Sequence, residues 1–357
     1  MTDAGVLLLG YGLAGRVFHA PLIGATDGLS IRTVVTGNPE RQEQARADLP
    51  GARIVADPEA ALADLDGIDL VVVAGANRTH VPQALAAIAQ GRHVVIDKPM
   101  AGTADDGHRI ADAARAAGAR VHPFQNRRWD SDFMTIVEVA RSGILGTLHR
   151  FESRIERMRV QPRGNWRESA DPADLGGVLL DFGAHLVDQA LILMGPVVAV
   201  DARARAIRDP QGSDDDMTIV LEHSSGATST LIGSQAAASG GPRFLLLGAD
   251  GAVRIEGSDT QEAALRSGRS PRDANWGRED FTATVVTVGD GTLDDVARPL
   301  MPGRWSDFYP AVRDALSGSA GPVEVDDAIA NLVVLDAARQ SVASGQRIRL
   351  SPPVGHA

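Results

Sequence analysis

The chain contains 357 residues, carries a formal charge of −11, and has 44% hydrophobic residues but no cysteine. The missing cysteines exclude disulfides, thiol nucleophiles and thiolate metal sites. The acidic balance argues against nucleic-acid or anionic-membrane partners, since both need clustered Lys and Arg. No apolar run reaches the roughly 18–20 residues that cross a bilayer, and nothing at the start is typical of a secretory signal, so we expect a cytoplasmic protein of two domains.

The first part of the chain, residues 1–124, alternates short apolar runs with longer Ala-rich segments of helical period. This alternation is typical of a parallel sheet covered by helices, so we expect a doubly wound α/β domain. The expected strands are Val6–Leu9, Ile31–Thr36, Leu70–Ala74, His93–Ile96 and Arg120–His122, and the expected helices are Arg16–Ile23, Pro39–Asp48, Pro58–Ala63, Thr79–Gln90 and Ala104–Ala117.

Residues 125–357 have a different texture, with alternating or β-branched runs that predict a second α/β domain built on a mostly antiparallel sheet. We expect long surface loops over Asp259–Gly291, a solvated turn at Asp214-Asp215-Asp216, and a final helix at about 326–344 that packs back on the first domain. The expected strands are Leu148–Val160, Val197–Ile207, Met217–His223, Thr228–Ile232, Arg243–Leu247 and Ala252–Glu256, with a helix over Ser131–Ser142.

A glycine-rich turn, Gly10-Tyr11-Gly12-Leu13-Ala14-Gly15, follows the strand Val6–Leu9 and opens a helix at about Leu13. In this context the glycines allow a tight turn and let backbone N–H groups approach a pyrophosphate. The motif therefore predicts a Rossmann dinucleotide-binding domain. The alternative is a tight strand-to-helix turn with no ligand.

The end of the second strand discriminates between cofactors, because a carboxylate there binds the ribose 2′-hydroxyl and repels a 2′-phosphate. This chain has no carboxylate at that tip, whereas Thr36, Gly37 and Asn38 are followed by the planar cation of Arg41. A guanidinium can grip phosphate, which favours NADP over NAD. In the alternative interpretation Asn38 only caps the next helix and Arg41 is solvated.

Two groups of residues are candidates for the chemistry. Lys98 follows the fourth expected strand, at the edge where open α/β sheets bind ligands, and could stabilise an alkoxide. Asp181, His185 and Asp188 fall at i, i+4 and i+7, and so would share one face of a helix. A carboxylate beside an imidazole suits a general base near neutral pH. A solvated lysine and a structural Asp–His hydrogen bond remain the alternatives.

With these motifs in this order, the chain resembles the Gfo/Idh/MocA family of oxidoreductases over nearly its whole length. It is most similar to the bacterial branch that includes NADP-dependent scyllo-inositol dehydrogenases. The segments that carry this likeness are Phe18-His19-Ala20-Pro21-Leu22, Asn126-Arg127-Arg128-Trp129-Asp130-Ser131-Asp132-Phe133, Trp166-Arg167-Glu168 and Asn275-Trp276-Gly277.

The resemblance implies NAD(P)-dependent oxidation of a secondary alcohol in a cyclitol or sugar, with Lys98, Asp181 and His185 as the catalytic set and no metal. It also implies a homodimer or homotetramer formed through the sheet of the second domain. It assigns cofactor contacts to the glycine turn, Thr36, Arg41, Ala74, Ala76, Asn77, His80, Asp97, Lys98, Pro99, Asn126, Trp166 and Arg167, and substrate contacts to Lys98, Arg128, Asn165, Asp181 and His185.

This chain departs from the family pattern at two positions. Asp97 stands where the family has a glutamate, and Gln125 stands where relatives commonly carry histidine. Both departures weaken the transfer of an exact substrate. Two other functions are alternatives to this one. The first is a dinucleotide-binding regulator without turnover, and the second is an oxidoreductase that recycles a tightly held cofactor between two sugars.

Overall fold

The computed structural model describes residues 3–161, 164–290 and 292–356, and these form two compact units. The first unit contains residues 1–126, 261–276 and 304–328, and the second contains residues 127–260, 277–303 and 329–357. We had expected a boundary at residue 124 with everything after it in one domain. Instead, two later segments, 261–276 and 304–328, belong to the first unit.

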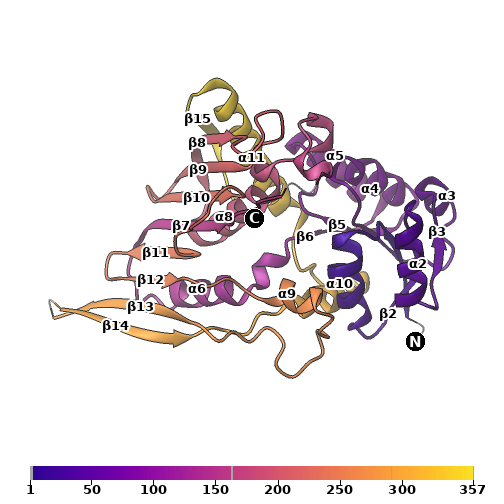
Figure 1. Ribbon diagram of the computed structural model, residues 1–357, viewed down its shortest axis with the longest axis horizontal. Coiled ribbons are helices and arrows are strands. Elements are labelled where there is room, and N and C mark those ends of the chain that lie inside the picture. Colours follow the sequence, from indigo (N-terminus) through magenta and orange to yellow (C-terminus); the bar gives the residue numbers. More distant parts are fainter. Residues whose placement is uncertain (1–2, 162–163, 291, 357) are drawn as a thin grey trace. The chain divides into compact units, whose positions relative to one another are not determined.

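The first unit is built on a six-stranded parallel sheet with the order β3-β2-β1-β4-β5-β6, of which β2, β3, β5 and β6 are labelled in Figure 1. This order is that of a dinucleotide-binding Rossmann sheet, as the sequence predicted. Its strands are β1 (Ala4–Leu9), β2 (Leu29–Val35), β3 (Arg53–Val55), β4 (Leu70–Val73), β5 (His93–Asp97) and β6 (Val121–Phe124). Its helices are η1 (Leu13–His19), α1 (Ala20–Gly24), α2 (Pro39–Asp48), α3 (Pro58–Ala63), η2 (Asn77–Thr79), α4 (His80–Ala89), α5 (Ala104–Ala117), α9 (Gln261–Arg266), η6 (Trp305–Asp307) and α10 (Phe308–Leu316).

Local sequence explains where these helices begin and end. Asn38 accepts a hydrogen bond from the N–H of Arg41 and is followed by Pro39, so α2 starts there. Thr103 caps α5 in the same way, through the N–H of Asp106. At its other end α5 stops at Gly118, whose φ of 64° suits glycine.

The segments that return to the first unit pack through aromatic rings. Phe308 and Tyr309 of α10 lie against Phe124 of β6, with the Phe308 ring 4.8 Å from the Phe124 ring and edge-on to it. The expected final helix is α11 (Val325–Ser344), but from Ile329 onward its residues belong to the second unit. The return to the first unit is therefore made by α9 and α10, which the sequence analysis did not predict.

The second unit is built on a nine-stranded sheet with the order β14-β13-β12-β11-β7-β10-β9-β8-β15, in which β7 and β10 are the only parallel pair among the residues that the structure describes. The prediction of a large, mostly antiparallel sheet is confirmed. Its strands are β7 (Leu148–Glu156), β8 (Val197–Arg205), β9 (Asp216–His223), β10 (Thr228–Ser234), β11 (Phe244–Gly248), β12 (Gly251–Ile255), β13 (Thr282–Gly289), β14 (Thr292–Pro299) and β15 (Ile348–Val354). Its helical segments are η3 (Asn126–Trp129), α6 (Ser131–Arg141), η4 (Trp166–Glu168), η5 (Pro172–Asp174), α7 (Val178–Asp181), α8 (Gly183–Met194) and most of α11.

One face of this sheet is covered by apolar side chains of α6, α8 and α11, which form one core with the inward side chains of the strands. The expected surface loops over Asp259–Gly291 are wrong in part, because this stretch contains α9 and β13. The expected solvated turn at Asp214-Asp215-Asp216 is also wrong. Asp215 is 4% exposed and accepts hydrogen bonds from Arg208, and Asp214 caps a helix, as described below.

Candidate functional site

The first group of candidate residues lies at the carboxyl ends of the parallel strands. In a Rossmann sheet ligands bind outside this edge, near the point where the strand order reverses, which here lies between β1 and β4. The segments that leave this edge begin at Gly10 after β1, Thr36 after β2, Ala74 after β4, Lys98 after β5 and Gln125 after β6. Every one of these segments except the last contains a predicted cofactor residue at its start, and Asn126 follows directly.

The glycine turn has the geometry that a dinucleotide cradle needs. Gly10 has a φ of 103°, and a Cβ placed on it would lie 2.7 Å from the carbonyl oxygen of Ala74. A Cβ on Gly15 would lie 1.9 Å from the Gly10 carbonyl oxygen. Only glycine therefore allows β1, η1 and β4 to approach each other this closely. Around Gly12, by contrast, the nearest atoms belong to the Arg41 guanidinium, 3.6 Å from such a Cβ.

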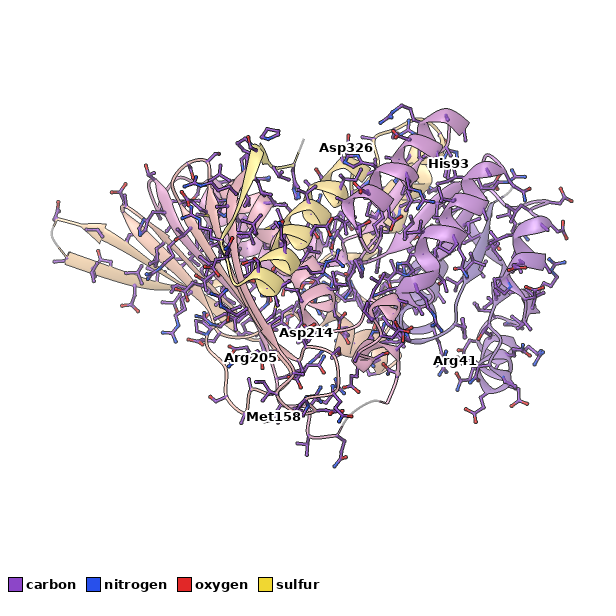
Figure 2. All side chains as sticks on the ribbon, turned by 90° about the horizontal axis from the view of Figure 1, so that it is seen from above. Arg41, His93, Met158, Arg205, Asp214 and Asp326 are labelled. Atoms are coloured by element: carbon purple, nitrogen blue, oxygen red, sulfur yellow. The ribbon has the colours of Figure 1, made fainter. Side chains whose placement is uncertain are left out.

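Arg41 comes from α2 and reaches back to the glycine turn. Its side chain is labelled in Figure 2. Its guanidinium makes no hydrogen bond or ion pair with any residue that the structure describes. The Thr36 side chain is buried beside β2, and Gln42 Nε2 donates to the Thr36 carbonyl at 2.9 Å. A guanidinium next to Gly12 that has no carboxylate partner in the described chain can bind a phosphate group through its N–H donors.

Lys98 lies after β5 on a segment held by two contacts. The Lys98 N–H donates to Asp97 Oδ1 at 2.9 Å, and Asp97 is 8% exposed. His80 Nδ1 lies 2.9 Å from the Pro99 carbonyl oxygen, and because that oxygen can only accept, Nδ1 is the donor. His80 was predicted to contact the cofactor, but the structure gives it a buried hydrogen bond that fixes the Lys98-Pro99 segment.

The other predicted cofactor residues of the first unit lie at the same sheet edge. Ala74 and Asn77 are buried after β4, where the Thr79 hydroxyl donates to the Ala76 carbonyl and tightens the turn. Asn126 is 6% exposed, directly after β6 and Gln125. These positions fit a ligand at this edge, and their contacts with a cofactor remain predictions.

The second group of candidates lies at the junction of α7 and α8. Asp181 is the last residue of α7, and His185 lies in the first turn of α8, 6% exposed, with its N–H donating to the Phe182 carbonyl at 3.0 Å. The chain bends by 49° between the stretches Pro172–Asp181 and Gly183–Met194. The single helix expected for Asp181, His185 and Asp188 is interrupted at Phe182, so Asp181 ends one helical segment while His185 and Asp188 lie together on the next.

Asp188 is bound instead to Arg128, sixty positions away in the sequence. Arg128 Nε lies 2.9 Å from Asp188 Oδ2 and Arg128 Nη2 lies 2.7 Å from Oδ1, a bidentate ion pair in which the Asp188 side chain is 3% exposed. Such a pair fixes both side chains. No local spacing signals this contact, so sequence analysis could not have found it.

The loop that carries the last three predicted residues is held by its own hydrogen bonds. Asn165 Oδ1 accepts from the N–H of Arg167 at 3.0 Å, and the Arg167 guanidinium lies 4.2 Å from the centre of the Trp166 ring. Asn165, predicted to contact substrate, is exposed and caps this turn. A Cβ on Gly176 would meet the Trp166 and Arg167 carbonyl oxygens at about 3 Å, so glycine lets the chain pass over this loop.

Asp214 is a residue of this region whose structural role the sequence analysis missed. Its Oδ2 accepts from the N–H of Leu179 at 2.7 Å, and its carbonyl accepts from the N–H of Val178, so it holds the start of α7. Burial raises the pKa of its carboxyl above the ordinary value, against the lowering effect of the N–H donors. Asp214 therefore positions the short helix that ends in Asp181.

Within residues 3–161, 164–290 and 292–356, no group of three or more His, Asp and Glu side chains could hold a metal ion. In the same ranges no single helix has the length and apolar content for crossing a membrane, although the bent pair Pro172–Asp181 and Gly183–Met194 passes that test by length and composition.

Comparisons with known proteins agree with this architecture. Residues 4–125 match the oxidoreductase family described as an NAD-binding Rossmann fold, and residues 133–254 match the GFO/IDH/MocA C-terminal domain. The scyllo-inositol 2-dehydrogenase (NADP(+)) IolW of Bacillus subtilis is 32% identical over 96% of this chain and 95% of its own length. The oxidoreductase YdgJ of Escherichia coli is 34% identical over 90% of this chain and 91% of its own length.

Solved structures give the same result. The structure of the oxidoreductase yvaA from Bacillus subtilis has a TM-score of 0.92 at 31% identity, and the match covers 98% of this chain and 99% of that one. The match therefore extends over both sheets, and the first of them is an NAD-binding fold. The chain belongs to the Gfo/Idh/MocA family of nicotinamide-dependent oxidoreductases.

Proposed function

We propose that this protein catalyses the reversible, NADP-linked oxidation of a secondary alcohol in a cyclitol or sugar similar to scyllo-inositol. The observation that carries the cofactor choice is the Arg41 guanidinium beside Gly12, with no carboxylate at the tip of β2. The substrate class is supported by the relatives named as inositol dehydrogenases, of which one is named as NADP-dependent. The cofactor choice and the substrate class are both compatible with Lys98, Asp181 and His185 as the predicted catalytic set.

Bound NADP would supply a hydride acceptor at its nicotinamide ring. The residues that would hold it are those predicted from the sequence, beginning with the glycine turn, Thr36 and Arg41. His185 takes the proton of the reacting hydroxyl, and the Lys98 ammonium donates a hydrogen bond to the developing alkoxide. Asp181 orients its neighbours, and the His80 and Asp97 contacts hold the Lys98 segment in place.

We also place this activity in the cytoplasm and in a homodimer or homotetramer assembled through the sheet of the second unit. The support for assembly is a set of large apolar side chains that the sheet strands leave in contact with solvent. These are Val220, Val288, Leu293 and Val296, between 40% and 72% exposed.

A spectrophotometric screen of inositols and aldoses with NADP and NAD in parallel tests the proposal. We expect at least one polyol to reduce NADP at a rate that Lys98→Met and His185→Ala each lower by about 10²-fold or more. His185→Ala should still bind NADPH, because His185 is not among the predicted cofactor contacts. A wild-type protein that binds NADP and reduces it with no polyol would contradict the proposal. A tenfold preference for NAD, about 1.4 kcal/mol, would contradict the cofactor assignment.

A further inference from the structure

Helix α2 turns one stripe of residues toward the glycine turn. Arg41, Ala45 and Asp48 follow each other at i, i+4 and i+7, which places them on one helical face. Arg41 lies beside Gly12, Ala45 is 0% exposed, and the Asp48 carboxylate reaches Tyr11 in the glycine turn itself. The predicted phosphate-binding cation thus shares its helix face with a contact to the turn.

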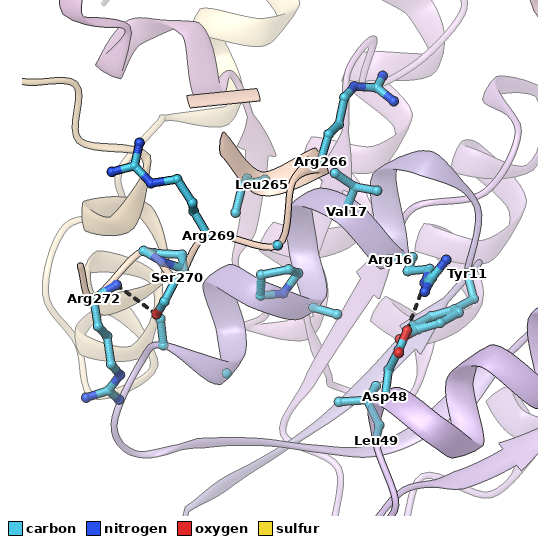
Figure 3. Close-up of a pocket in the computed structure, with 16 residues that line it drawn as sticks. Tyr11, Arg16, Val17, Asp48, Leu49, Leu265, Arg266, Arg269, Ser270 and Arg272 are labelled. Carbon is cyan, nitrogen blue, oxygen red and sulfur yellow. Dashed lines mark hydrogen bonds and ion pairs between the residues drawn. The ribbon is translucent and has the colours of Figure 1, made fainter. Parts of the chain in front are cut away.

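The contact at Asp48 has two donors on one oxygen. The Tyr11 hydroxyl donates to Asp48 Oδ2 at 3.1 Å and Arg16 Nε donates to the same atom at 2.8 Å, as Figure 3 shows. Tyr11 is 2% exposed, and burial, then the neighbouring Asp48 carboxylate, raises the pKa of its phenol. The phenol therefore stays protonated and acts as a donor to an ionised carboxylate. Charge-assisted hydrogen bonds of this kind are stronger than neutral ones.

This cluster lies beside a pocket rather than in the body of the core. Tyr11, Arg16 and Asp48 line one side of a pocket of about 520 Å³, and Arg266, Ser270 and Arg272 line another side. The Asp48 side chain is 37% exposed. A single exposed ion pair stabilises a fold very little. The two donors that converge on Asp48 therefore need an explanation other than bulk stability.

Tethers at both ends determine where α2 lies. At the first end Asn38 caps the helix, and Gln42 donates to the Thr36 carbonyl of the β2 tip. At the last end Asp48 is bound to Tyr11 and Arg16. Arg41 projects from between these two points. A fork-shaped contact between guanidinium and phosphate depends on position to within a few tenths of an ångström, so both tethers affect it.

We infer that Tyr11 and Asp48 are positioning residues for cofactor selection. They hold α2 at the distance from the glycine turn at which Arg41 meets the 2′-phosphate of the dinucleotide. This inference rests on the NADP preference of the proposed function. It assigns a role to the second residue of the glycine motif, whose side chain the phosphate cradle itself does not require.

A simple charge effect makes the opposite prediction, which allows a sharp test. Asp48 lies two helical turns from Arg41, about 10 Å along the axis at 1.5 Å per residue. A carboxylate at that distance repels a phosphate weakly. Removing its charge without loss of position would therefore strengthen binding of a 2′-phosphate, whereas loss of the tether weakens it. The direction of the change decides between the two.

The experiment measures the dissociation constants of 2′,5′-ADP and 5′-AMP with the full chain by titration calorimetry. The proteins are wild type, Tyr11→Phe, Asp48→Asn and Arg41→Met, with Glu43→Gln as control. Glu43 is exposed on the opposite face of α2, so its change removes a charge from the same helix without touching the cluster. Because the ratio of the two constants is insensitive to a uniform loss of folded protein, it reports on position and not on stability.

We expect wild type and Glu43→Gln to share one preference for 2′,5′-ADP, and Arg41→Met to lose it. Tyr11→Phe and Asp48→Asn should each reduce the preference by about threefold to tenfold. A tenfold reduction corresponds to about 1.4 kcal/mol. A wild type without preference overturns the NADP assignment, and this inference with it. A preference that persists in both cluster variants, or that rises in Asp48→Asn, overturns this inference alone. If Asp48→Asn does not fold, Tyr11→Phe decides the matter, since it removes only a hydroxyl.

Discussion

At the scale of single residues, the side chains beside Lys98 and beside the glycine turn differ in the partners that the structure gives them. Asp97 and His80 form hydrogen bonds with the backbone of the Lys98-Pro99 segment. Arg41 differs from them, because its guanidinium has no partner in the described part of the chain although it lies next to Gly12. This unpaired cation beside the predicted phosphate-binding turn is the feature that most restricts the proposed cofactor.

Arg41→Met therefore tests the cofactor assignment in turnover. The change keeps an unbranched side chain and removes the fork of donors, so kcat/KM for NADP should fall by about 10-fold to 100-fold, as expected for loss of a hydrogen bond to a charged group. The value for NAD should change by less than about threefold. Steady-state kinetics with both cofactors check this, and an equal loss for the two would show that Arg41 does not contact the 2′-phosphate.

The residues that sequence analysis placed correctly are those whose role depends on neighbours in the chain. Glycines of the turn, the missing carboxylate at the β2 tip and Lys98 at a strand end are all properties of short segments. The Arg128–Asp188 pair was not predictable, because it joins positions sixty residues apart through the tertiary fold. Asp181 and His185 were expected on one unbroken helix, whereas the structure interrupts that helix at Phe182.

At the scale of elements, α7 shows how a short helix is held by a distant carboxylate. Four residues cannot sustain a helix by propagation alone. Asp214 receives the N–H of Leu179, and Gly177 before the helix has a φ of 91° with Asp214 Oδ1 only 2.1 Å from where its Cβ would lie. Asp214 thus occupies space that only glycine leaves open, and it fixes the element that ends in Asp181.

Substitution of Asp214 separates capping from charge. Asp214→Ala should lower the free energy of unfolding by about 0.5–2 kcal/mol, since it removes the cap. Asp214→Asn keeps an acceptor but does not titrate. Because burial raises the folded-state pKa of Asp214, its protonated form stabilises the fold, and that contribution is lost as pH rises above the ordinary value of 3.8. The Asn variant should therefore gain stability relative to wild type with rising pH in urea titrations. A constant difference would contradict the raised pKa.

Some helices and strands of the fold were predictable from the sequence and others were not. The strands of the first sheet were predictable because they are continuous apolar runs between helices of clear period. The hairpin of β13 and β14 was not, because β14 is exposed along most of its length and lacks an alternation of buried and exposed residues. Helix α10 was missed although Phe308, Val312 and Ala315 are buried at the spacing of one helical face. Its packing against Phe124 has no local signal in the sequence.

At the scale of the whole molecule, the two units each enclose buried titratable groups, and the first unit encloses histidines in particular. His19 and His122 are 0% and 2% exposed, and burial lowers the pKa of each to about 4. Neither ring nitrogen of His122 has a hydrogen-bond partner among the described residues. A histidine with a lowered folded-state pKa is charged first in the unfolded chain. Its contribution to stability is therefore lost as pH falls from 6.5 toward about 4.

This linkage predicts an acid-sensitive fold. From pH 7 to pH 5, His122 alone should cost about 2 kcal/mol of unfolding free energy, by the rule that one pKa unit corresponds to about 1.4 kcal/mol. His122→Leu should abolish that share while leaving other buried histidines to act. Urea unfolding followed by tryptophan fluorescence at the two pH values measures the difference. Parallel losses in wild type and variant would show that His122 does not titrate as described.

The fate of the hydrogen on the reacting carbon tests the central claim most directly. A polyol that supports turnover is prepared with deuterium at its carbinol carbons and incubated with the protein and NADP, and the reduced cofactor is then analysed by mass spectrometry. Direct hydride transfer predicts NADPH that carries one deuterium, formed by wild type and not by Lys98→Met or His185→Ala. Unlabelled NADPH, or none with any polyol while NADP binds, would contradict the account.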